Sequence, residues 1–480
     1  MSVTAVATKP RTTKKTPVRR TSSTPREDAG GFSAEACVIG AGPAGLAAGK
    51  SLADRGISFD WFEKGSMVGG LWRIDNDNGG VAAYKTLHLN SSRVPSQFPS
   101  YPMPSDWPDF PSHELMAKYF QRFAEDNDLL RRITFKAEVT KVVPLPGPGK
   151  PGERGWAVTT TATGTRHYRH VLVANGHHST PKIPEFPGEF TGESFHSHSY
   201  VEPTVFVDKD VVVVGVGNSG MDIACDAAKV AHSVHLVTRR GVHVLPKYAF
   251  GKPIDTFGTP INGYLPFSVE RRMYELVERF SSGRPEDRGL PKPDHRLLEA
   301  HPTVSAELYD RVGHGDVVMK PNIDSLEGDK IRFVDGTAVH ADTLVYATGY
   351  DVALPFLDAS VYGTAGNRMP LYQRVVSPDR PGLWFVGFIQ TVGANISLFE
   401  HQSQWVGDLL TGEAALPSEE QMKAWITRDQ EAMAKRYVHS GRHTMQVDQW
   451  RYVRAMKEAR AHKAHPSLLN RLTAPLAGLR

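Results

Sequence analysis

The sequence predicts an α/β fold in which one strand–loop–helix unit occurs twice, with the second copy inserted into the first. Two glycine patterns lead to this prediction, because residues 40–45 and 215–220 each follow a short apolar strand and open a small-residue helix. The chain has 480 residues, of which 40% are hydrophobic, and this is enough for two or three packed cores.

The first glycine pattern reads Gly-Ala-Gly-Pro-Ala-Gly and follows the apolar residues 36–39. Gly40 permits a tight turn, Gly42 lets a pyrophosphate approach the backbone, and Gly45 lets the helix pack closely on the strand. The free N–H groups at the start of the helix then attract phosphate. The pattern predicts a Rossmann-like dinucleotide site that includes Gly40, Gly42, Pro43, Ala44 and Gly45.

An acidic residue completes this first site. The next strand, residues 59–62, ends at Glu63, whose carboxylate can accept both hydroxyl protons of a ribose, and Lys64 follows it. A glycine pattern alone is a weak signal, and an ordinary glycine-rich turn is the competing interpretation. The strand, the helix and the acid together favour the nucleotide site.

The second copy differs from the first at one informative position. Residues 210–214 form a valine-rich strand before Gly215, and Thr238 stands where the first copy has Glu63. Arg239 and Arg240 follow, so a guanidinium pair replaces the acid that would repel a 2′-phosphate, unless these arginines only solvate a strand end. The comparison assigns FAD to the first site and NADPH to the second. The second site is predicted to include Gly215, Gly217, Asn218, Ser219, Gly220, Asp222, Thr238, Arg239 and Arg240.

Three further apolar runs are assigned to the FAD domain. Residues 171–176 and 344–350 each read as a buried strand ending in a small-residue turn, and residues 383–387 read as another strand. A helix that includes residues 400–410 follows, and its N-terminus can stabilise negative charge on a flavin, although a plain core strand and helix is the alternative. The predicted cofactor contacts in these runs are Ala347, Thr348, Gly349 and Gln390.

These assignments predict a domain organisation. It comprises a disordered basic tail over residues 1–33, an FAD-binding domain over 34–207 and 330–440, an NADP-binding domain over 208–329 with an insertion at 248–312, and a C-terminal helical tail over 441–480. The first tail is rich in Thr, Ser and Pro and nearly free of large apolar residues. The insertion has one amphipathic stretch near residues 269–280 and can cover the cofactor cleft or make an oligomer contact, which leaves a homodimer open.

Composition excludes several classes of protein. The net charge of +4 comes from the N-terminal tail, and the nearly neutral remainder argues against nucleic acid as a partner. No apolar run is long enough to span a membrane, which predicts a soluble protein, and no His/Cys/Asp cluster has the spacing of a metal site. The only cysteines, Cys37 and Cys225, lie beside different glycine patterns, which excludes a disulfide reductase and indicates a reducing, cytoplasmic compartment. O2 is then the electron acceptor that needs no further redox group.

Further motifs resemble those of the flavin-containing monooxygenases. Residues 190–200 read FTGESFHSHSY, which is similar to the family's F-x-G-x-x-x-H-x-x-x-(Y/F) pattern. Residues 69–72 are similar to its G-G-x-W segment, residues 84–92 to the segment that carries its active-site asparagine, and residues 347–350 to its A-T-G-Y turn. The matches follow the family's order from about residue 36 to residue 405.

The resemblance implies a monooxygenase that oxygenates a soft nucleophile, an amine nitrogen or a sulfide sulfur, of a small molecule. It implies that NADPH reduces FAD, that O2 adds to the flavin C4a carbon, and that retained NADP+ shields the resulting hydroperoxide. The protein then positions the cofactors and excludes water. Asn90 is the implied catalytic residue, since its amide can donate and accept between flavin and NADP. The other implied flavin contacts are Gly70, Leu71, Trp72 and Leu89.

Two other functions stay open. The related Baeyer–Villiger enzymes act on ketones and usually have Trp where Tyr200 stands, which favours amine or sulfide chemistry. A non-catalytic redox sensor that binds both nucleotides, with the basic tail as a docking arm, is the second alternative. For His196, a structural role in the linker and a catalytic role are both consistent with the sequence, and for a functional His196 a role in coupling domain movement is favoured over proton transfer.

Overall fold

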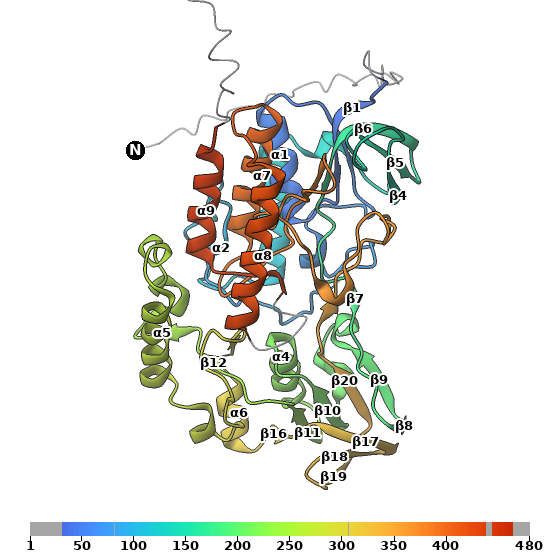
Figure 1. Cartoon of the computed structure of the whole chain (residues 1–480). Helices are drawn as coiled ribbons and strands as arrows, with labels where there is room; N and C mark the ends of the chain where they lie inside the picture. Colours follow the sequence, from blue (N-terminus) through green and yellow to red (C-terminus); the bar gives the residue numbers. More distant parts are fainter. Residues whose placement is uncertain (1–30, 81, 306, 438–443, 464–480) are drawn as a thin grey trace, which may run out of the picture.

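The computed structural model describes residues 31–80, 82–305, 307–437 and 444–463. Two α/β units lie one above the other, and the chain builds the second unit before it returns to complete the first (Figure 1). In each unit a central strand leads into a glycine loop and a helix. The predicted fold, two Rossmann-like units with one inserted in the other, is confirmed.

The first unit is built on a seven-stranded sheet. In the order of pairing its strands are β3 (Ile133–Thr134), β2 (Phe59–Phe62), β1 (Ala34–Ile39), β6 (Gly164–Val173), β5 (Trp156–Thr160) and β4 (Val139–Pro144), and β22 (Leu383–Phe385) also pairs with β6. Because β1 is parallel to β2 and to β6, the carboxyl ends of these three strands meet at one edge, where α1 (Pro43–Asp54) begins.

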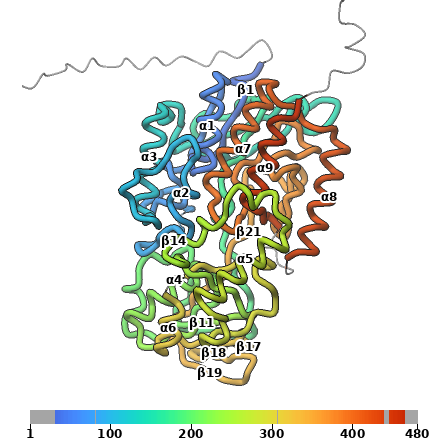
Figure 2. The backbone as a smooth tube through the Cα atoms, turned by 90° about the vertical axis from the view of Figure 1, so that its left-hand side faces the viewer, coloured from blue at the N-terminus to red at the C-terminus, as the bar shows by residue number. Residues whose placement is uncertain are grey.

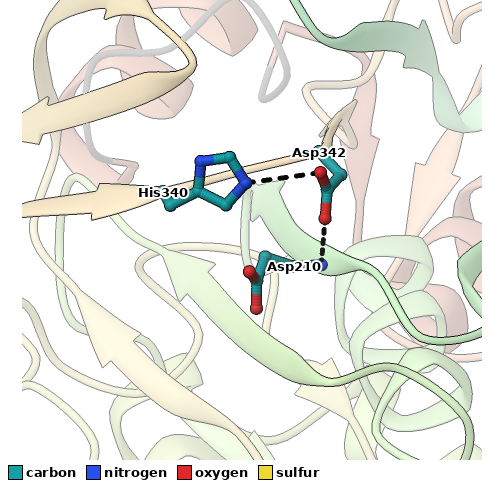
Figure 3. Close-up of side chains that lie close together, drawn as sticks. All are labelled: Asp210, His340 and Asp342. Atoms are coloured by element: carbon teal, nitrogen blue, oxygen red, sulfur yellow. Dashed lines mark hydrogen bonds and ion pairs between the residues drawn. The ribbon is translucent and has the colours of Figure 1, made fainter.

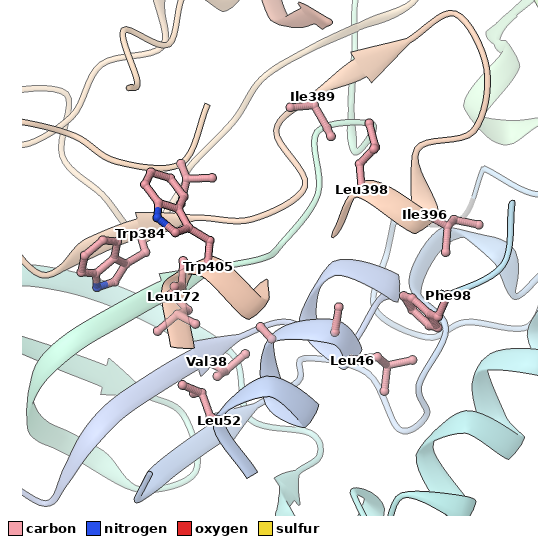
Figure 4. Packing of buried hydrophobic residues seen from close by; sticks show 14 of the residues in the cluster. Val38, Leu46, Leu52, Phe98, Leu172, Trp384, Ile389, Ile396, Leu398 and Trp405 are labelled. Atoms are coloured by element: carbon pink, nitrogen blue, oxygen red, sulfur yellow. The ribbon is translucent and has the colours of Figure 1, made fainter. Parts of the chain in front are cut away.

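Apolar layers cover both faces of this sheet. Successive residues of β1 alternate between two cores: Val38 joins one cluster and Ile39 the other. Leu46 of α1 and Trp405 of α7 (Ile396–Leu410) are both buried in the first cluster (Figure 4). The remaining helices of this unit are α2 (Arg93–Ser96), α3 (His113–Asp126), α8 (Glu419–Arg436) and α9 (Gln449–Ala461).

The second unit repeats this arrangement on a five-stranded parallel sheet. Its order is β16 (Val318–Lys320), β11 (Ser233–Val237), β10 (Asp210–Val214), β20 (Thr343–Tyr346) and β9 (Glu193–His196). β10 leads into α4 (Asn218–Ala227), and its valines also alternate between two cores. A smaller sheet of order β19 (Ala338–His340), β18 (Lys330–Phe333), β17 (Ile323–Gly328) and β8 (Gly188–Phe190) accompanies it.

Strand pairing moves the predicted boundaries between the units. β8 pairs with β17 and β9 with β20, so these strands belong to the second unit, whereas the sequence predicts residues 34–207 to be in the FAD domain. The same correction applies to β18, β19 and β20, because β20 lies between β10 and β9. The chain crosses at the antiparallel pair of β7 (Thr180–Pro181) and β21 (Tyr350–Asp351). Apolar composition predicts a buried strand but not the sheet that it joins.

The segment predicted as an insertion lies across the junction of the two units (Figure 2). Its elements are β13 (Tyr248–Ala249), β14 (Lys252–Pro253), α5 (Phe267–Ser281), β15 (Thr303–Val304) and the start of α6 (Leu308–His314). β12 (Val244–Leu245) lies just before the insertion and pairs with β15. α5 confirms the amphipathic helix. Arg451 of α9 binds Glu270 of α5 with 2.7 Å between Nη1 and Oε2, so the insertion contacts the first unit.

At the N-terminal end, the structure differs from the sequence prediction at the first described residues. Phe32 is buried, with the Arg169 guanidinium 4.2 Å from its ring centroid, so order begins before residue 34; residues 1–30 of the predicted tail lie outside the described residues. α9 places a helix in the predicted C-terminal tail, of which residues 464–480 also lie outside the described part. None of the helices in the described ranges is long and apolar enough to cross a membrane.

Candidate functional site

The first glycine loop has a geometry that only glycine can adopt. Gly40 has φ +98°, and a Cβ there would lie 2.7 Å from the carbonyl oxygen of Ala174. A Cβ on Gly45 would lie 1.9 Å from the carbonyl oxygen of Gly40. Gly42 precedes α1, and no side chain caps this helix end. Its first N–H groups are therefore left for an external acceptor such as phosphate.

Glu63 lies beside this loop at the end of β2. The carboxylate is buried, and it accepts hydrogen bonds from the N–H of Ala41 at 2.6 Å and of Gly65 at 2.7 Å. The Trp61 indole N–H donates to the Gly40 carbonyl at 2.8 Å, which fixes the loop on the strand. Lys64 is exposed and forms an ion pair with Glu138 at 3.0 Å, outside the loop.

The Gly-Gly-Leu-Trp segment lies on the same loop. Its single turn, Gly70–Trp72, is held by the Gly69 N–H, which donates to the Ala41 carbonyl at 3.0 Å. A Cβ on Gly42 would lie 3.7 Å from the Gly70 Cα, so the two glycine backbones face each other closely. Leu71 is half-buried, as is Trp72, which packs against the first core.

The second glycine loop repeats the first closely. Gly215 has φ +110°, and a Cβ there would lie 2.5 Å from the carbonyl oxygen of Ala347. A Cβ on Gly220 would again lie 1.9 Å from the carbonyl oxygen of the first glycine, and α4 begins after Gly217 with no side-chain cap. Ser219 lies in the first turn of α4, half-buried. Each unit thus has an uncapped helix N-terminus at its glycine loop.

The turn formed by Ala347, Thr348 and Gly349 contacts the second loop and not the first. β20 leads into it, and β20 pairs with β10 of the second sheet. The equivalent position at the first loop is the turn after β6, where Ala174 contacts Gly40. The assignment of residues 347–349 to the FAD domain is therefore corrected, because the strand before them belongs to the other sheet.

The end of β11 carries the predicted 2′-phosphate residues. Thr238 is buried, and its N–H donates to the Lys320 carbonyl at 2.9 Å. Arg239 and Arg240 are both exposed, and Arg240 makes one long ion pair with Asp294 at 3.5 Å. Arg239 makes no ion pair with any residue that the structure describes. Both guanidiniums can thus reach an anion in solution.

Two residues predicted at the second site use their side chains elsewhere. The Asn218 side-chain oxygen Oδ1 accepts the Val304 N–H at 2.9 Å and so holds β15 of the insertion. The Asp222 carboxylate accepts the Tyr84 hydroxyl at 2.6 Å. Burial raises the pKa of Asp222 to about 6. Sequence position alone identifies neither partner, since both come from distant segments.

Asn90 lies in a segment that is hydrogen-bonded to the first unit. The Leu89 N–H donates to the Pro111 carbonyl at 2.9 Å, and the Leu89 side chain is buried in the first core. The Asn90 side chain is half-buried, and its amide makes no hydrogen bond to any of the described residues. Its donor and acceptor are therefore both available to a ligand.

Two polar residues near the first loop were missed by the sequence reasoning. The Asn175 side-chain oxygen and the His177 Nε2 are buried and have no hydrogen-bond partner among the described residues. The Asn175 Cα would lie 3.2 Å from a Cβ on Gly40, and burial lowers the pKa of His177 to about 4. Such orphaned groups fit a site for a bound dinucleotide. Aligning residues 174–176 with residues 347–349 would have indicated Asn175.

The segment after β22 also reaches the first loop. Gly387 has φ +89°, and a Cβ there would lie 2.7 Å from the Ala44 Cβ at the start of α1. Its N–H donates to the Gln402 side chain at 2.9 Å, which ties it to α7. Gln390 lies in β23 (Gln390–Thr391), which pairs with β24 (Gln446–Val447).

The F-x-G-x-x-x-H-x-x-x-Y segment includes β9, which forms one edge of the sheet of the second unit. His196 at the end of β9 is buried, its Nδ1 accepts the His198 N–H at 3.1 Å, and its ring centroid lies 5.1 Å from that of Tyr350. Burial lowers the pKa of His196, so the imidazole is neutral at pH 7. Tyr200 donates its hydroxyl to Asp226 of α4 at 3.0 Å.

One other group of side chains has the proximity of metal ligands. Asp210, His340 and Asp342 meet at the amino ends of β10 and β20 (Figure 3). Asp342 accepts the Asp210 N–H at 2.8 Å, and Asp210 accepts the Ser233 hydroxyl at 2.6 Å. These hydrogen bonds indicate that the three residues hold the strand ends together. They lie at the edge of the sheet opposite to the glycine loop.

Two glycine loops with free helix N-termini, one backed by an acid and the other by arginines, define a flavoprotein of the two-dinucleotide class. The model of the family described as "Flavin-binding monooxygenase-like" matches residues 34–476. The chain therefore belongs to this family, whose members use FAD and NADP.

Individual proteins that the chain resembles in sequence or structure support this family assignment. The chain is 35% identical to flavin-containing monooxygenase 5 of Oryctolagus cuniculus over 448 residues, which covers 88% of this chain and 81% of the relative. It is similar to S-allyl-L-cysteine S-oxygenase from Allium sativum, with a TM-score of 0.67, 25% identity and coverage of 92% and 91%. A closed structure of cyclohexanone monooxygenase, 18% identical with a TM-score of 0.66 and coverage of 89% and 97%, shares the fold. The predicted flavin monooxygenase is confirmed.

Proposed function

We propose that this monooxygenase oxygenates a soft nucleophile, the nitrogen of an amine or the sulfur of a sulfide, in a small molecule. The observation that carries the proposal is the likeness to an S-oxygenase over 92% of this chain. The buried imidazoles agree with this proposal. Oxygenation of a ketone needs a negatively charged oxidant, which a nearby cation would favour. Burial lowers the pKa of His177 and of His196, so neither imidazole supplies such a cation. Two classes of substrate thus share one requirement, a lone pair that takes an electrophilic oxygen.

The flavin is proposed to bind at the first loop, where it supplies the activation of O2 after reduction by NADPH. Glu63 holds the ribose end, and the uncapped start of α1 holds the pyrophosphate. The residues proposed to contact FAD are Gly40, Gly42, Pro43, Ala44, Gly45, Glu63, Gly70, Leu71, Trp72 and Leu89, joined by Asn175 and His177.

NADPH is proposed to bind at the second loop. Arg239 and Arg240 bind the 2′-phosphate, and the start of α4 binds the pyrophosphate. The other proposed contacts are Gly215, Gly217, Ser219, Gly220 and Thr238. Asn90 is the proposed catalytic residue: its free amide bridges the two cofactors and holds their reactive ends in register while the core residues around it exclude water.

The test is NADPH-dependent oxygenation of three probes, a thioether, a tertiary amine and a cyclic ketone. We expect sulfoxide and N-oxide in amounts that match the NADPH consumed. Conversion of the ketone alone, to an ester, contradicts the proposed substrate class. No oxygenation of any probe, with flavin bound and slowly reduced, supports the redox sensor instead.

Self-association and location are proposed on separate grounds. The outer face of α5 exposes Val269, Met273, Leu276 and Phe280, which supports a homodimer that covers this stripe. Light scattering tests it: Met273→Gln with Leu276→Gln should convert a dimer into a monomer, and a monomeric parent protein contradicts it.

Two buried free cysteines support a reducing, cytoplasmic compartment.

A further inference from the structure

The Asn90 segment (residues 84–92) is held by both units of the molecule. On the side of the first unit, the Leu87 carbonyl accepts the His113 N–H at 2.9 Å and the Leu89 N–H donates to Pro111. On the side of the second unit, the Lys85 N–H donates to the Val201 carbonyl at 2.9 Å. Asn90 therefore lies on a segment that is hydrogen-bonded to both units.

Two carboxylates of α4 bind the first residues of this segment. Asp222 accepts the Tyr84 hydroxyl at 2.6 Å, and Asp226 accepts the Thr86 hydroxyl. Asp226 also accepts the Tyr200 hydroxyl, and the Tyr84 and Tyr200 rings lie 5.5 Å apart. Asp222 and Asp226 are four residues apart on one helix, so they project from the same face toward the segment.

We propose that Asp222 and Asp226 are positioning residues that tie the Asn90 segment to the start of α4, so that nucleotide binding at the second loop sets the position of Asn90. This inference rests on the proposed role of Asn90. It also reassigns Asp222, whose carboxylate acts through Tyr84 and not on the nucleotide.

The energetics favour a rigid connection. A hydrogen bond to an ionised carboxylate is roughly twice as strong as one between neutral groups. Asp226 is buried and Asp222 largely so, and the carboxylate of Asp222 lies one turn from the helix N-terminus, where the helix dipole stabilises negative charge. A nucleotide phosphate at that N-terminus fixes α4, and α4 then fixes residues 84 and 86.

Hydrogen exchange of the FAD-loaded protein measures the connection directly. Tyr84→Phe and Asp222→Ala should each lower the protection of the amides of residues 85–91 by roughly tenfold, the loss of one charged hydrogen bond. Asp222→Asn keeps an acceptor for Tyr84 and should restore most of the protection. Tyr101→Phe is the matched control, since Tyr101 donates to Asp126 on the surface and should leave residues 85–91 unchanged.

The transmitted effect is measured by adding NADP+. In the parent protein NADP+ should increase the protection of residues 85–91, and in Asp222→Ala this increase should be absent. In turnover, Tyr84→Phe should raise the fraction of NADPH lost as hydrogen peroxide several-fold while the KM for NADPH changes less than twofold. A purely structural role of Tyr84 would not raise the peroxide loss while leaving the KM for NADPH nearly unchanged.

Three results overturn the inference. The first is unchanged protection in Tyr84→Phe, the second is an NADP+ effect that survives in Asp222→Ala, and the third is lowered protection with unchanged peroxide loss. The failure of the proposed role of Asn90 is distinguishable, because Asn90→Ala then leaves peroxide loss unchanged while the exchange results on Tyr84 and Asp222 still stand by themselves.

Discussion

The two glycine loops share their backbone and differ in their side chains. Gly40 and Gly215 both have positive φ, and both third glycines would place a Cβ 1.9 Å from the first glycine's carbonyl oxygen. At the end of the following strand, the first loop has the buried Glu63 and the second has Thr238 followed by the exposed Arg239. We therefore propose that backbone geometry makes each loop a dinucleotide site and that the strand-end residue selects which dinucleotide binds there.

The surroundings of the loops differ as well. The first loop is covered by the Gly-Gly-Leu-Trp segment and by the turn at Gly387. The second is tied to the insertion by the Thr303 hydroxyl, which donates to the Val216 carbonyl, and by the Val304 N–H, which donates to the Asn218 side chain. The more enclosed loop suits a cofactor that stays bound through turnover, and the more open one suits a cofactor that exchanges.

The largest effect is expected from removing the glycine geometry of the first loop. Gly45→Ala places a methyl group 1.9 Å from a backbone oxygen, so the loop must shift. We expect flavin content to fall more than tenfold, with a loss of about 1–3 kcal/mol in the free energy of unfolding. Absorbance of the purified protein and thermal unfolding measure both. Gly313→Ala, which meets nothing within 4 Å, should leave them unchanged.

The arginine pair should produce the next effect. Arg239→Ala with Arg240→Ala removes two charged contacts to the 2′-phosphate, so the KM for NADPH should rise roughly 10–100-fold while that for NADH barely changes. Lys64→Ala is the matched control, since Lys64 holds the position of Arg239 in the first copy. Equal effects on both nucleotides contradict the comparison of the two strand ends.

Asn90 should affect coupling and not binding. Asn90→Ala should keep flavin bound, because no described residue depends on its amide, yet divert NADPH to hydrogen peroxide roughly tenfold more often, the loss of one hydrogen bond that aligns the cofactors. Peroxide and product are measured together. If the ratio is unchanged, Asn90 has no role in the chemistry.

The smallest effect concerns pH. Burial raises the pKa of Asp222 to about 6, and the groups facing it are Tyr84, Lys247, Asp226 and Glu307. The pKa of this carboxyl is higher in the folded protein than in the unfolded chain, where it is about 3.9. Its contribution to the free energy of unfolding is therefore fully present below about pH 3.9 and is lost as the pH rises through about 6. Asp222→Asn does not titrate, so its stability relative to the parent should improve between pH 4 and pH 8, by on the order of 1–3 kcal/mol. Thermal unfolding at both pH values checks this, and a pH-independent difference contradicts it.

The sequence predicts the parts of the molecule that depend on local pattern. Strand, glycine loop and helix are contiguous in each unit, so β1 with α1 and β10 with α4 are found from residues alone. The sequence does not predict which sheet β9 and β20 join, because the residues of an apolar strand do not indicate the strand with which it pairs. The side-chain partners of Asp222 and Asn218 were missed for the same reason, since Tyr84 and Val304 lie far away along the chain.

The central claim is that the flavin lies at the first loop and its reductant binds at the second. Anaerobic titration of the Gly220→Ala variant with NADPH tests it most directly, because this change disturbs only the second loop. The account predicts a yellow protein with full flavin content whose absorbance dithionite bleaches and NADPH does not. A variant that has lost its flavin, or one that NADPH bleaches as readily as the parent protein, contradicts it.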